Sequence, residues 1–429
     1  MSVSTAPLHP GRRRALPAAA AIVAPCPSAD YARALARRGT LAVAVTTSDS
    51  LSRGHCSPGT PGYGHTVVHD GGLARTSRRL RSLGVRAVLA GSPRGAALAE
   101  RLADALALPA DPATALRRCD RGEQARVLAQ AKTGVPCTWR TQELTTALAW
   151  WRICAHPAIL LLPAAVGAPA APVLCRSSRE IAVAWPQMRR TAHRYSGSTH
   201  LILREHLPGR RYTTHSLTRP APAGGEATHT ITDVWAHSHT DDTILARIDL
   251  LPRQGMLARA LALYTQRVLQ ILGVRAGPAC CHLIYEPGRG PLLLSMAAAA
   301  ATSPADQVLQ AATGINRLGH ALDTVLPPPA APPTAEQPSA FRHIVRVRLN
   351  APHRGYLDER HLAALRALPT VAHCTNSLIP GAPVEQTTSA RSAAGEVVLS
   401  HPRAQAIEAD YQHIRRLERS GLYGADGSR

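Results

Sequence analysis

The sequence is poor in the residue types that several functions require. Only 3% of its 429 residues are aromatic, and phenylalanine occurs once, as Phe341. Stacking of bases on aromatic side chains, as in single-strand nucleic-acid binders, is therefore not expected. No run of 18 apolar residues is present, so no membrane-spanning helix is predicted. The nine cysteines lack paired spacing, which is typical of a reduced, cytoplasmic protein and not of a disulfide scaffold.

Lysine and acidic residues are also scarce. The chain has 49 Lys and Arg against 28 Asp and Glu, a net charge of +21, and its one lysine is Lys132. Such a charge suggests an acidic partner. An excess of Arg, Ala and Pro is, however, also what a GC-rich genome encodes whatever the function. The basic clusters at 12–14, 78–81 and 342–348 are scattered, so nucleic acid is not an expected partner, and a polyanion binder is an alternative that rests on charge alone.

The first 112 residues alternate between strand-like and helix-like runs, which predicts an open parallel α/β sheet. The runs are 29–39, 41–46, 66–69, 74–83, 85–90 and 96–106. A basic and apolar start mimics a secretory signal, but it continues directly into this pattern. Ligands of such sheets lie beyond the carboxyl ends of the strands, here near Cys26, Asp70 and Ser92. None of these turns has the Gly-x-Gly-x-x-Gly pattern of a dinucleotide site.

From Arg117 onward the order of the segments becomes specific. The segments are 118–121, 134–137, 156–163, 203–212, 231–235, 277–279, 311–314 and 397–402. In this order they resemble the ATP-grasp superfamily, and within it the carboxylate–amine ligases that act on amino acids and dipeptides. The resemblance covers almost the whole chain. It implies an ATP-grasp fold of α/β and α+β type, with an N-terminal open parallel-sheet domain and a small C-terminal α/β domain.

The resemblance also implies a division of the chain into five parts. These are a pre-ATP-grasp domain at 1–112, a lid subdomain at 113–200, a core subdomain at 201–326, a proline-rich linker at 327–338 and the C-terminal domain at 339–429.

In such ligases ATP is clamped between two subdomains, and a carboxylate is activated as an acyl phosphate that an amine attacks. The implied cofactors are ATP and Mg²⁺, and the implied ligands are a nucleotide and a small carboxylate or amine. An active paralogue or a second copy of the chain is the expected protein partner. This chemistry needs cations on the phosphates, carboxylates on Mg²⁺ and an edge that reads adenine.

The adenine edge is the best preserved of the three. Glu205 lies where the family's glutamate accepts from the adenine amino group, and His206 and Leu207 lie where the hinge backbone pairs with the base. The alternative is that Glu205 is a surface carboxylate beside Arg204.

The phosphate clamp is altered. The first family lysine corresponds to Arg121, which keeps the charge but replaces a compact ammonium by a planar fork. The second corresponds to Leu161, which cannot bind phosphate. The loop that would cover the phosphates, 164–170, contains Pro169, which removes a backbone donor.

The metal site is altered further. The positions of the two Mg²⁺-bridging glutamates and the polar residue after them are occupied by His282, Ser295 and Ala299. Mg²⁺ prefers hard oxygen ligands, which imidazole and alanine do not supply. Asp249 occupies a family acidic position and is expected to support its strand.

A new site in the old cleft is an alternative. Cys280 and His282 alternate along a strand and so face one side. With His215, His237 or His239 they would hold Zn²⁺ or present a thiolate; otherwise Cys280 is an ordinary buried cysteine. The other candidates, a set of histidines and acids around a hairpin, are predicted to form a solvated loop. They are His229, His237, His239, Asp241 and Asp242.

Two hypotheses for function follow from the resemblance. In the first, the chain has lost ligase chemistry and is a pseudoenzyme or binding subunit. In the second, it is an active ATP-dependent amino-acid ligase with an arginine-based phosphate clamp and with carboxylates recruited from the loop at 241–242. The clamp arginines would be Arg121 with Arg204, Arg210 or Arg211.

Overall fold

The computed structural model describes residues 18–26, 31–47, 62–221, 225–240, 244–300, 305–326, 342–389 and 392–425. The predicted features that fall outside these ranges are the basic cluster at 12–14, the acidic pair at 241–242, the proline-rich linker at 327–338 and Phe341. Within them, no helix is long and apolar enough to cross a bilayer, and the eight described cysteines are free thiols.

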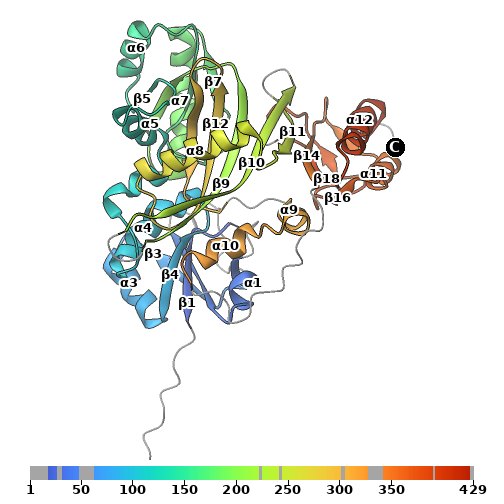
Figure 1. Ribbon diagram of the computed structural model, residues 1–429. Coiled ribbons are helices and arrows are strands. Elements are labelled where there is room, and N and C mark those ends of the chain that lie inside the picture. Colours follow the sequence, from blue (N-terminus) through green and yellow to red (C-terminus); the bar gives the residue numbers. More distant parts are fainter. Residues whose placement is uncertain are drawn as a thin grey trace, which may run out of the picture.

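The N-terminal domain is a parallel sheet in the order β3-β2-β1-β4, covered on both faces by helices (Figure 1). On β1, Ala19, Ala21 and Val23 face α3 and α4, whereas Ala20 and Ile22 face α1 and α10. Burial on both faces is the reason why β1 is entirely apolar. The elements are β1 Ala19–Val23, α1 Tyr31–Ala36, β2 Leu41–Thr47, β3 His65–His69, α3 Leu73–Ser82, β4 Val85–Ala90, η1 Pro93–Gly95, α4 Ala96–Ala105 and η2 Pro112–Arg118. The predicted open parallel sheet is confirmed, and β4 has the predicted bounds.

The lid is a small antiparallel sheet in the order β5-β8-β6-β7, with α6 and α7 packed on one face. Asp120 caps α5 by accepting from the backbone N–H of Glu123, and Ser177 caps α7 in the same way through Glu180. The elements are α5 Arg121–Gln130, β5 Thr138–Thr141, α6 Leu144–Ile153, β6 Ile159–Pro163, β7 Val173–Cys175, α7 Ser178–Ser196 and β8 Leu201–Glu205.

The core contains the first five strands of an eight-stranded antiparallel sheet in the order β13-β12-β9-β10-β11-β14-β18-β16. Helix α8 covers one face, where Leu261 and Val268 pack on Cys281 and Leu283. The opposite face of the sheet carries Trp235, which packs on α9 through Leu309. The elements are β9 Arg210–Arg219, β10 Thr228–Thr240, β11 Ile244–Leu250, α8 Met256–Ile271, β12 Gly277–Glu286, β13 Gly290–Ala297, α9 Asp306–Thr313 and α10 Arg317–Asp323.

The C-terminal segment continues the same sheet. Strand β14 pairs with β11, with Arg247 opposite Val347, so no break separates the core strands from the last three. Helices α11 and α12 and a small sheet, β17-β15-β19, complete this part with its own apolar core. The elements are β14 His343–Leu349, β15 Gly355–Leu357, α11 Glu359–Arg366, β16 Val371–Cys374, β17 Pro383–Val384, β18 Gly395–His401, α12 Ala404–Ser420 and β19 Tyr423–Ala425.

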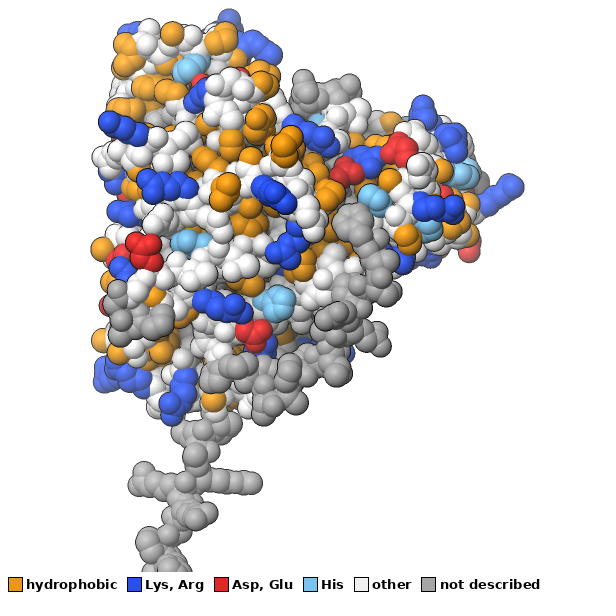
Figure 2. Space-filling model, viewed as in Figure 1, with side chains coloured by type: hydrophobic (Ala, Val, Ile, Leu, Met, Phe, Trp, Pro, Cys, Tyr) orange, Lys and Arg blue, Asp and Glu red, His pale blue; other side chains and the backbone are white. Residues whose placement is uncertain are grey.

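Positive charge is spread over the surface. On the face drawn in Figure 2, the Lys and Arg side chains are dispersed among apolar and neutral groups and do not gather in one stripe. On this face, the positive charge is therefore not concentrated at one site.

Candidate functional site

A cavity of about 430 Å³ lies where the N-terminal domain, the lid and the core meet. The carboxyl ends of β1 and β4 contribute Cys26 and Ser92, and β12 contributes Cys280 and His282. Of the three predicted strand-end positions, Asp70 does not line this cavity; it forms an ion pair with Arg75 on the surface. The volume is in the range of roughly 300–1,000 Å³ that small-molecule sites occupy.

Strand register places three chemically active side chains in one row on the face that meets the cavity. Cys280 on β12 is opposite His215 on β9, and His215 is opposite Asp233 on β10. Directly opposite residues point to the same face of a sheet, about 4.5–5.5 Å apart at Cβ. A bulge between Ile231 and Asp233 re-aims β10 at this point.

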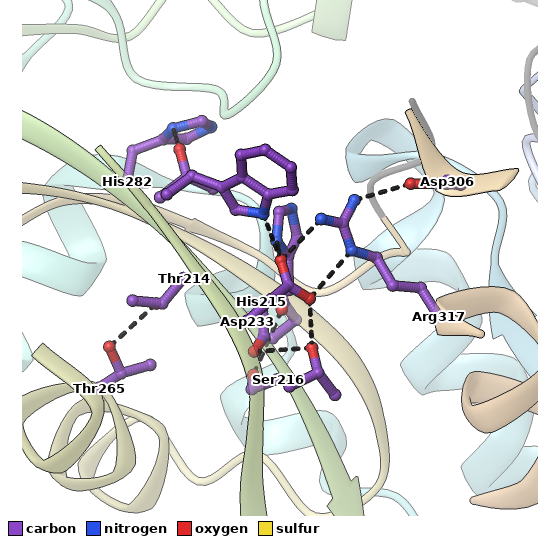
Figure 3. A network of polar contacts seen from close by, with 12 residues as sticks. Thr214, His215, Ser216, Asp233, Thr265, His282, Asp306 and Arg317 are labelled. Atoms are coloured by element: carbon purple, nitrogen blue, oxygen red, sulfur yellow. Dashed lines mark hydrogen bonds and ion pairs between the residues drawn. The ribbon is translucent and has the colours of Figure 1, made fainter. Parts of the chain in front are cut away.

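The row is fixed by a dense set of hydrogen bonds around Asp233 (Figure 3). His215 Nδ1 donates to Asp233 Oδ1 at 2.6 Å, and Thr232 Oγ1 donates to Oδ2 at 2.7 Å. The indole N–H of Trp235 also donates to Oδ1. Arg317 on α10 donates from Nη2 to Oδ1 at 2.6 Å and from Nε to Oδ2 at 3.1 Å. Because all lone pairs of this buried carboxylate are engaged, its orientation is determined.

The charges of the row are arranged as an ion pair. Burial and the Arg317 charge oppose protonation of His215, but Asp233 and Cys280 outweigh them and raise the pKa of His215. Burial would raise the pKa of the Cys280 thiol, but hydrogen bonds and charge from His215 and His282 outweigh it and lower that pKa. These shifts favour the thiolate form of Cys280 beside a protonated His215. Cys281, which faces α8, has the opposite shift, because burial raises its pKa.

A second row lies two residues along the same strands. The Thr213 hydroxyl is 3.2 Å from His282 Nδ1 and 2.9 Å from His237 Nε2. Burial and the neighbouring histidines lower the pKa of His237 well below its usual value, so this ring is neutral. The prediction of a solvated loop is wrong for His229, His237 and His239, because all three lie in β10. His237 and His229 have threonine partners on β9, and His239 pairs with Leu245 on β11.

The lid contributes apolar and arginine side chains to the cavity. Arg121 lines it, and its Nη1 donates to the carbonyls of Pro163, at 2.9 Å, and of Ala165. Arg204 is buried between lid and core and donates to the Leu294 carbonyl at 2.9 Å. Burial, then the nearby charges of Arg121 and Arg211, lowers the pKa of Arg204. Arg121 and Arg204 of the lid thus lie close to Arg211 of the core strand β9.

The expected position of Leu161 in the cleft is wrong by one residue. Leu161 is fully buried in the lid core against α6 and α7, and Leu162 lines the cavity in its place. The reason is the two-residue period of β6, in which a shift of one residue exchanges the two faces. The chemistry is unchanged, since leucine at either position offers phosphate no charge.

The residues predicted to bind adenine make contacts within the protein. Glu205 is not a surface carboxylate: it is 5% exposed, and its Oε1 accepts from Arg289 Nη1 at 2.8 Å and from the Cys137 N–H at 2.7 Å. The backbone N–H of His206 donates to the Ala158 carbonyl at 3.1 Å. Leu207 follows β8 in a half-buried turn and does not line the cavity.

The cavity does not fit Mg²⁺. Ser295 and Ala299 line it, as does His282, but none of the described residues in its wall is aspartate or glutamate. Asp249 forms an ion pair with Arg247 at 2.6 Å, in line with the expected strand-supporting role. Nor does the described part of the chain hold a group of three or more His, Cys, Asp and Glu side chains arranged for a metal. The zinc alternative for Cys280 and His282 is therefore not supported, and the thiolate alternative is.

This architecture is similar to that of several solved structures. An L-amino acid ligase from Bacillus licheniformis superposes with a TM-score of 0.67 at 14% identity, over 93% of this chain and 97% of the ligase. An N5-carboxyaminoimidazole ribonucleotide synthetase in complex with ADP superposes with a TM-score of 0.64 at 13% identity, over 94% and 98%. The chain has the ATP-grasp fold. A biotin carboxylase domain from Hydrogenobacter thermophilus 2-oxoglutarate carboxylase, solved as a dimer with MgADP and bicarbonate, gives a TM-score of 0.58 at 12% identity, over 96% and 91%. No protein-family model and no curated protein sequence matches the chain.

In ATP-grasp terms, the cavity lies between lid and core. Sequence reasoning singled out Cys280, His282 and Arg121 and named His215 as one of three partners. It missed the roles of Asp233, Arg317 and Arg289. Asp233 gives one signal, since it is an acidic residue directly before the apolar run 234–236 in β10. Arg317 and Arg289 give none, because each is 84 residues from its acidic partner.

Proposed function

We propose that this chain is a divergent ATP-grasp protein of the carboxylate–amine ligase lineage that no longer performs Mg²⁺-dependent ATP chemistry and acts as a binding subunit. The observation that carries the proposal is the wall of the cavity, which presents Cys280, His282 and Ser295 and no carboxylate among its described residues. Removing one charge-stabilising group typically costs about 3–4 kcal/mol, or roughly 10²- to 10³-fold in rate. Loss of several leaves little ligase activity.

The contacts of the predicted adenine-binding residues support the same conclusion. Glu205 is paired with Arg289, whose side chain is 40% exposed, so an adenine amino group would compete with this ion pair for the buried carboxylate. Arg121 keeps a positive charge at the cavity, which favours a small anionic ligand such as a carboxylate. A second copy of the chain or an active paralogue would be the protein partner of such a subunit.

The first test is thermal unfolding of the full chain with and without millimolar ATP and Mg²⁺. A ligand at 100 times its dissociation constant adds about 2.7 kcal/mol of stability, which would raise the melting temperature by a measurable amount. We expect no metal-dependent rise and no release of ADP or phosphate when amino acids are added.

The control is Arg121→Ala, measured in the same way. A rise in melting temperature that needs Mg²⁺ and disappears in Arg121→Ala would refute the proposal and establish the alternative, an active ligase with an arginine clamp. If ATP produces no rise in either protein, the proposed loss of nucleotide chemistry stands.

A further inference from the structure

We infer that the cavity is a thiol-dependent acyl-transfer site in which Cys280 is the nucleophile, His215 the general acid and base, and Asp233 the residue that positions His215. The substrate class is an acyl donor with a short aliphatic acyl group, such as a thioester or an activated ester. Neither the fold nor the structural relatives assign such an activity to this chain.

The first support is the arrangement of the row. A nucleophile, a base within hydrogen-bond reach of it and a third group that orients the base are the geometric signature of covalent catalysis. Here each member comes from its own strand, and the strands are neighbours in the order β12, β9, β10. The 2.6 Å hydrogen bond from His215 Nδ1 to Asp233 leaves the Nε2 side of the ring for Cys280. Strand pairing, and not a loop, therefore sets the geometry.

The second support is the position of the thiol. Cys280 is 4% exposed, and the space it meets is the cavity, not bulk solvent. Around it the wall is made of small and apolar side chains that leave room for an acyl chain but offer it few polar partners. They include Leu162, Val166, Ala168, Ala297 and Ala299. Such a wall selects for short aliphatic groups and excludes water around the reacting carbon.

The third support is charge. A thiolate, not a thiol, is the attacking species, and it forms only where neighbouring groups stabilise it. His215 lies directly opposite Cys280 on the neighbouring strand, and His282 lies two residues along β12 on the same face. Asp233 in turn keeps His215 protonated, and the neutral His237 orients His282 through Thr213.

The reaction is balanced by the groups present. The thiolate attacks the acyl carbon, so that a carbon–sulfur bond forms and the bond from that carbon to the leaving heteroatom breaks. The leaving group takes the proton of the His215 imidazolium. In the second half, water or an amine attacks the thioester and gives its proton to His215, while the sulfur leaves as the thiolate. No oxidant, metal or nucleotide is consumed.

The test uses the full chain and p-nitrophenyl acetate at about pH 6, where an ordinary thiol with a pKa of about 8.5 is protonated. Peptide mass mapping should find one acetyl group on Cys280, formed with release of one p-nitrophenol. The rate should exceed that of free cysteine by about 10- to 100-fold, since a larger thiolate fraction is partly offset by lower intrinsic nucleophilicity. Acetylation of other residues only would overturn the inference.

Two variants make the result specific. Cys280→Ala should abolish acetylation, whereas Cys281→Ala, the adjacent thiol on the opposite face, should leave it intact. His215→Gln should keep the thiol but move the pH midpoint of acetylation up toward that of a free cysteine; an unmoved midpoint would contradict the role of His215. The wild-type mapping needs no variant to fold, and neither result depends on whether ATP binds, so this inference and the proposed function fail separately.

Discussion

Two buried carboxylates in the same sheet invite comparison. Asp233 on β10 and Glu396 on β18 are both buried. Against the opposing effect of burial, His215 and Arg317 lower the pKa of Asp233, and Arg346 and Arg348 lower the pKa of Glu396. Arg346 donates to Glu396 through two hydrogen bonds of 2.9 Å, and Arg348 adds one of 3.1 Å. The Trp235 ring lies near both clusters, 5.6 Å from Arg317 and 5.9 Å from Arg346.

The two clusters differ in what the acid is connected to. The partners of Glu396 are arginines of the adjacent strand, so its charge is compensated within the β14–β18 pair. Asp233 is hydrogen-bonded to His215, which lies opposite Cys280, a thiol in a cavity wall. Burial and a shifted pKa are thus shared by a structural and a candidate functional cluster. The link to a nucleophile at an accessible space is what separates them.

Neutralising each acid should have the largest effect. Asp233→Asn removes one of the two carboxylates paired with the buried Arg317, and Glu396→Gln removes the carboxylate shared by the half-buried Arg346 and Arg348, so each should lower the unfolding free energy by about 3–5 kcal/mol in urea titrations. Only Asp233→Asn should also slow acetylation of Cys280 at about pH 6, by about 10-fold or more, because His215 loses the charge that keeps it protonated. If both variants slowed acetylation equally, a general loss of stability, and not the positioning of His215 by Asp233, would determine the reactivity of the Cys280 thiol.

The acid dependence of stability should not distinguish the clusters. Both folded-state pKa values lie below the ordinary carboxylate values, so each acid contributes stability that is present above about pH 4 and is lost as the pH falls. Each neutral variant should reduce the slope of unfolding free energy against pH by up to about one proton, or about 1.4 kcal/mol per pH unit. Urea unfolding between neutral and acid pH measures this; a slope that only one variant changes would contradict it.

Hydroxyl deletions should have the smallest effects. Thr213→Val removes the group between His237 and His282, and Ser400→Ala removes an acceptor of Arg342 beside the Glu396 cluster. Each should cost about 1 kcal/mol of unfolding free energy. Thr213→Val should slow acetylation of Cys280 a few-fold and Ser400→Ala should not. If acetylation is slower in Thr213→Val than in Ser400→Ala at equal stability, the contact of Thr213 with His282 contributes to the reactivity of Cys280. Equal acetylation rates would show that His282 does not stabilise the thiolate.

The sequence predicted most of the fold because its elements have strong local periodicity. The strand-like run at 85–90 is β4, Val85–Ala90, and the helix-like run at 96–106 is α4, Ala96–Ala105. The site was less predictable because its decisive pairs are long-range. Glu205 meets Arg289, and Asp233 meets Arg317, only after the sheets and helices assemble. The exchange of Leu161 for Leu162 has a different origin, since a one-residue register error inverts the faces of a strand.

The pairing of β11 with β14 makes the sheet dependent on the C-terminal segment. If the residues after 342 were removed, the backbone N–H and C=O groups of β11 that now pair with β14 would form an open edge. Such edges recruit strands from other molecules and promote aggregation. Residues 343–429, about a fifth of the chain, therefore cover the edge of the sheet that carries Asp233 and His215. Deletion of this segment would expose that edge even if the cavity were kept.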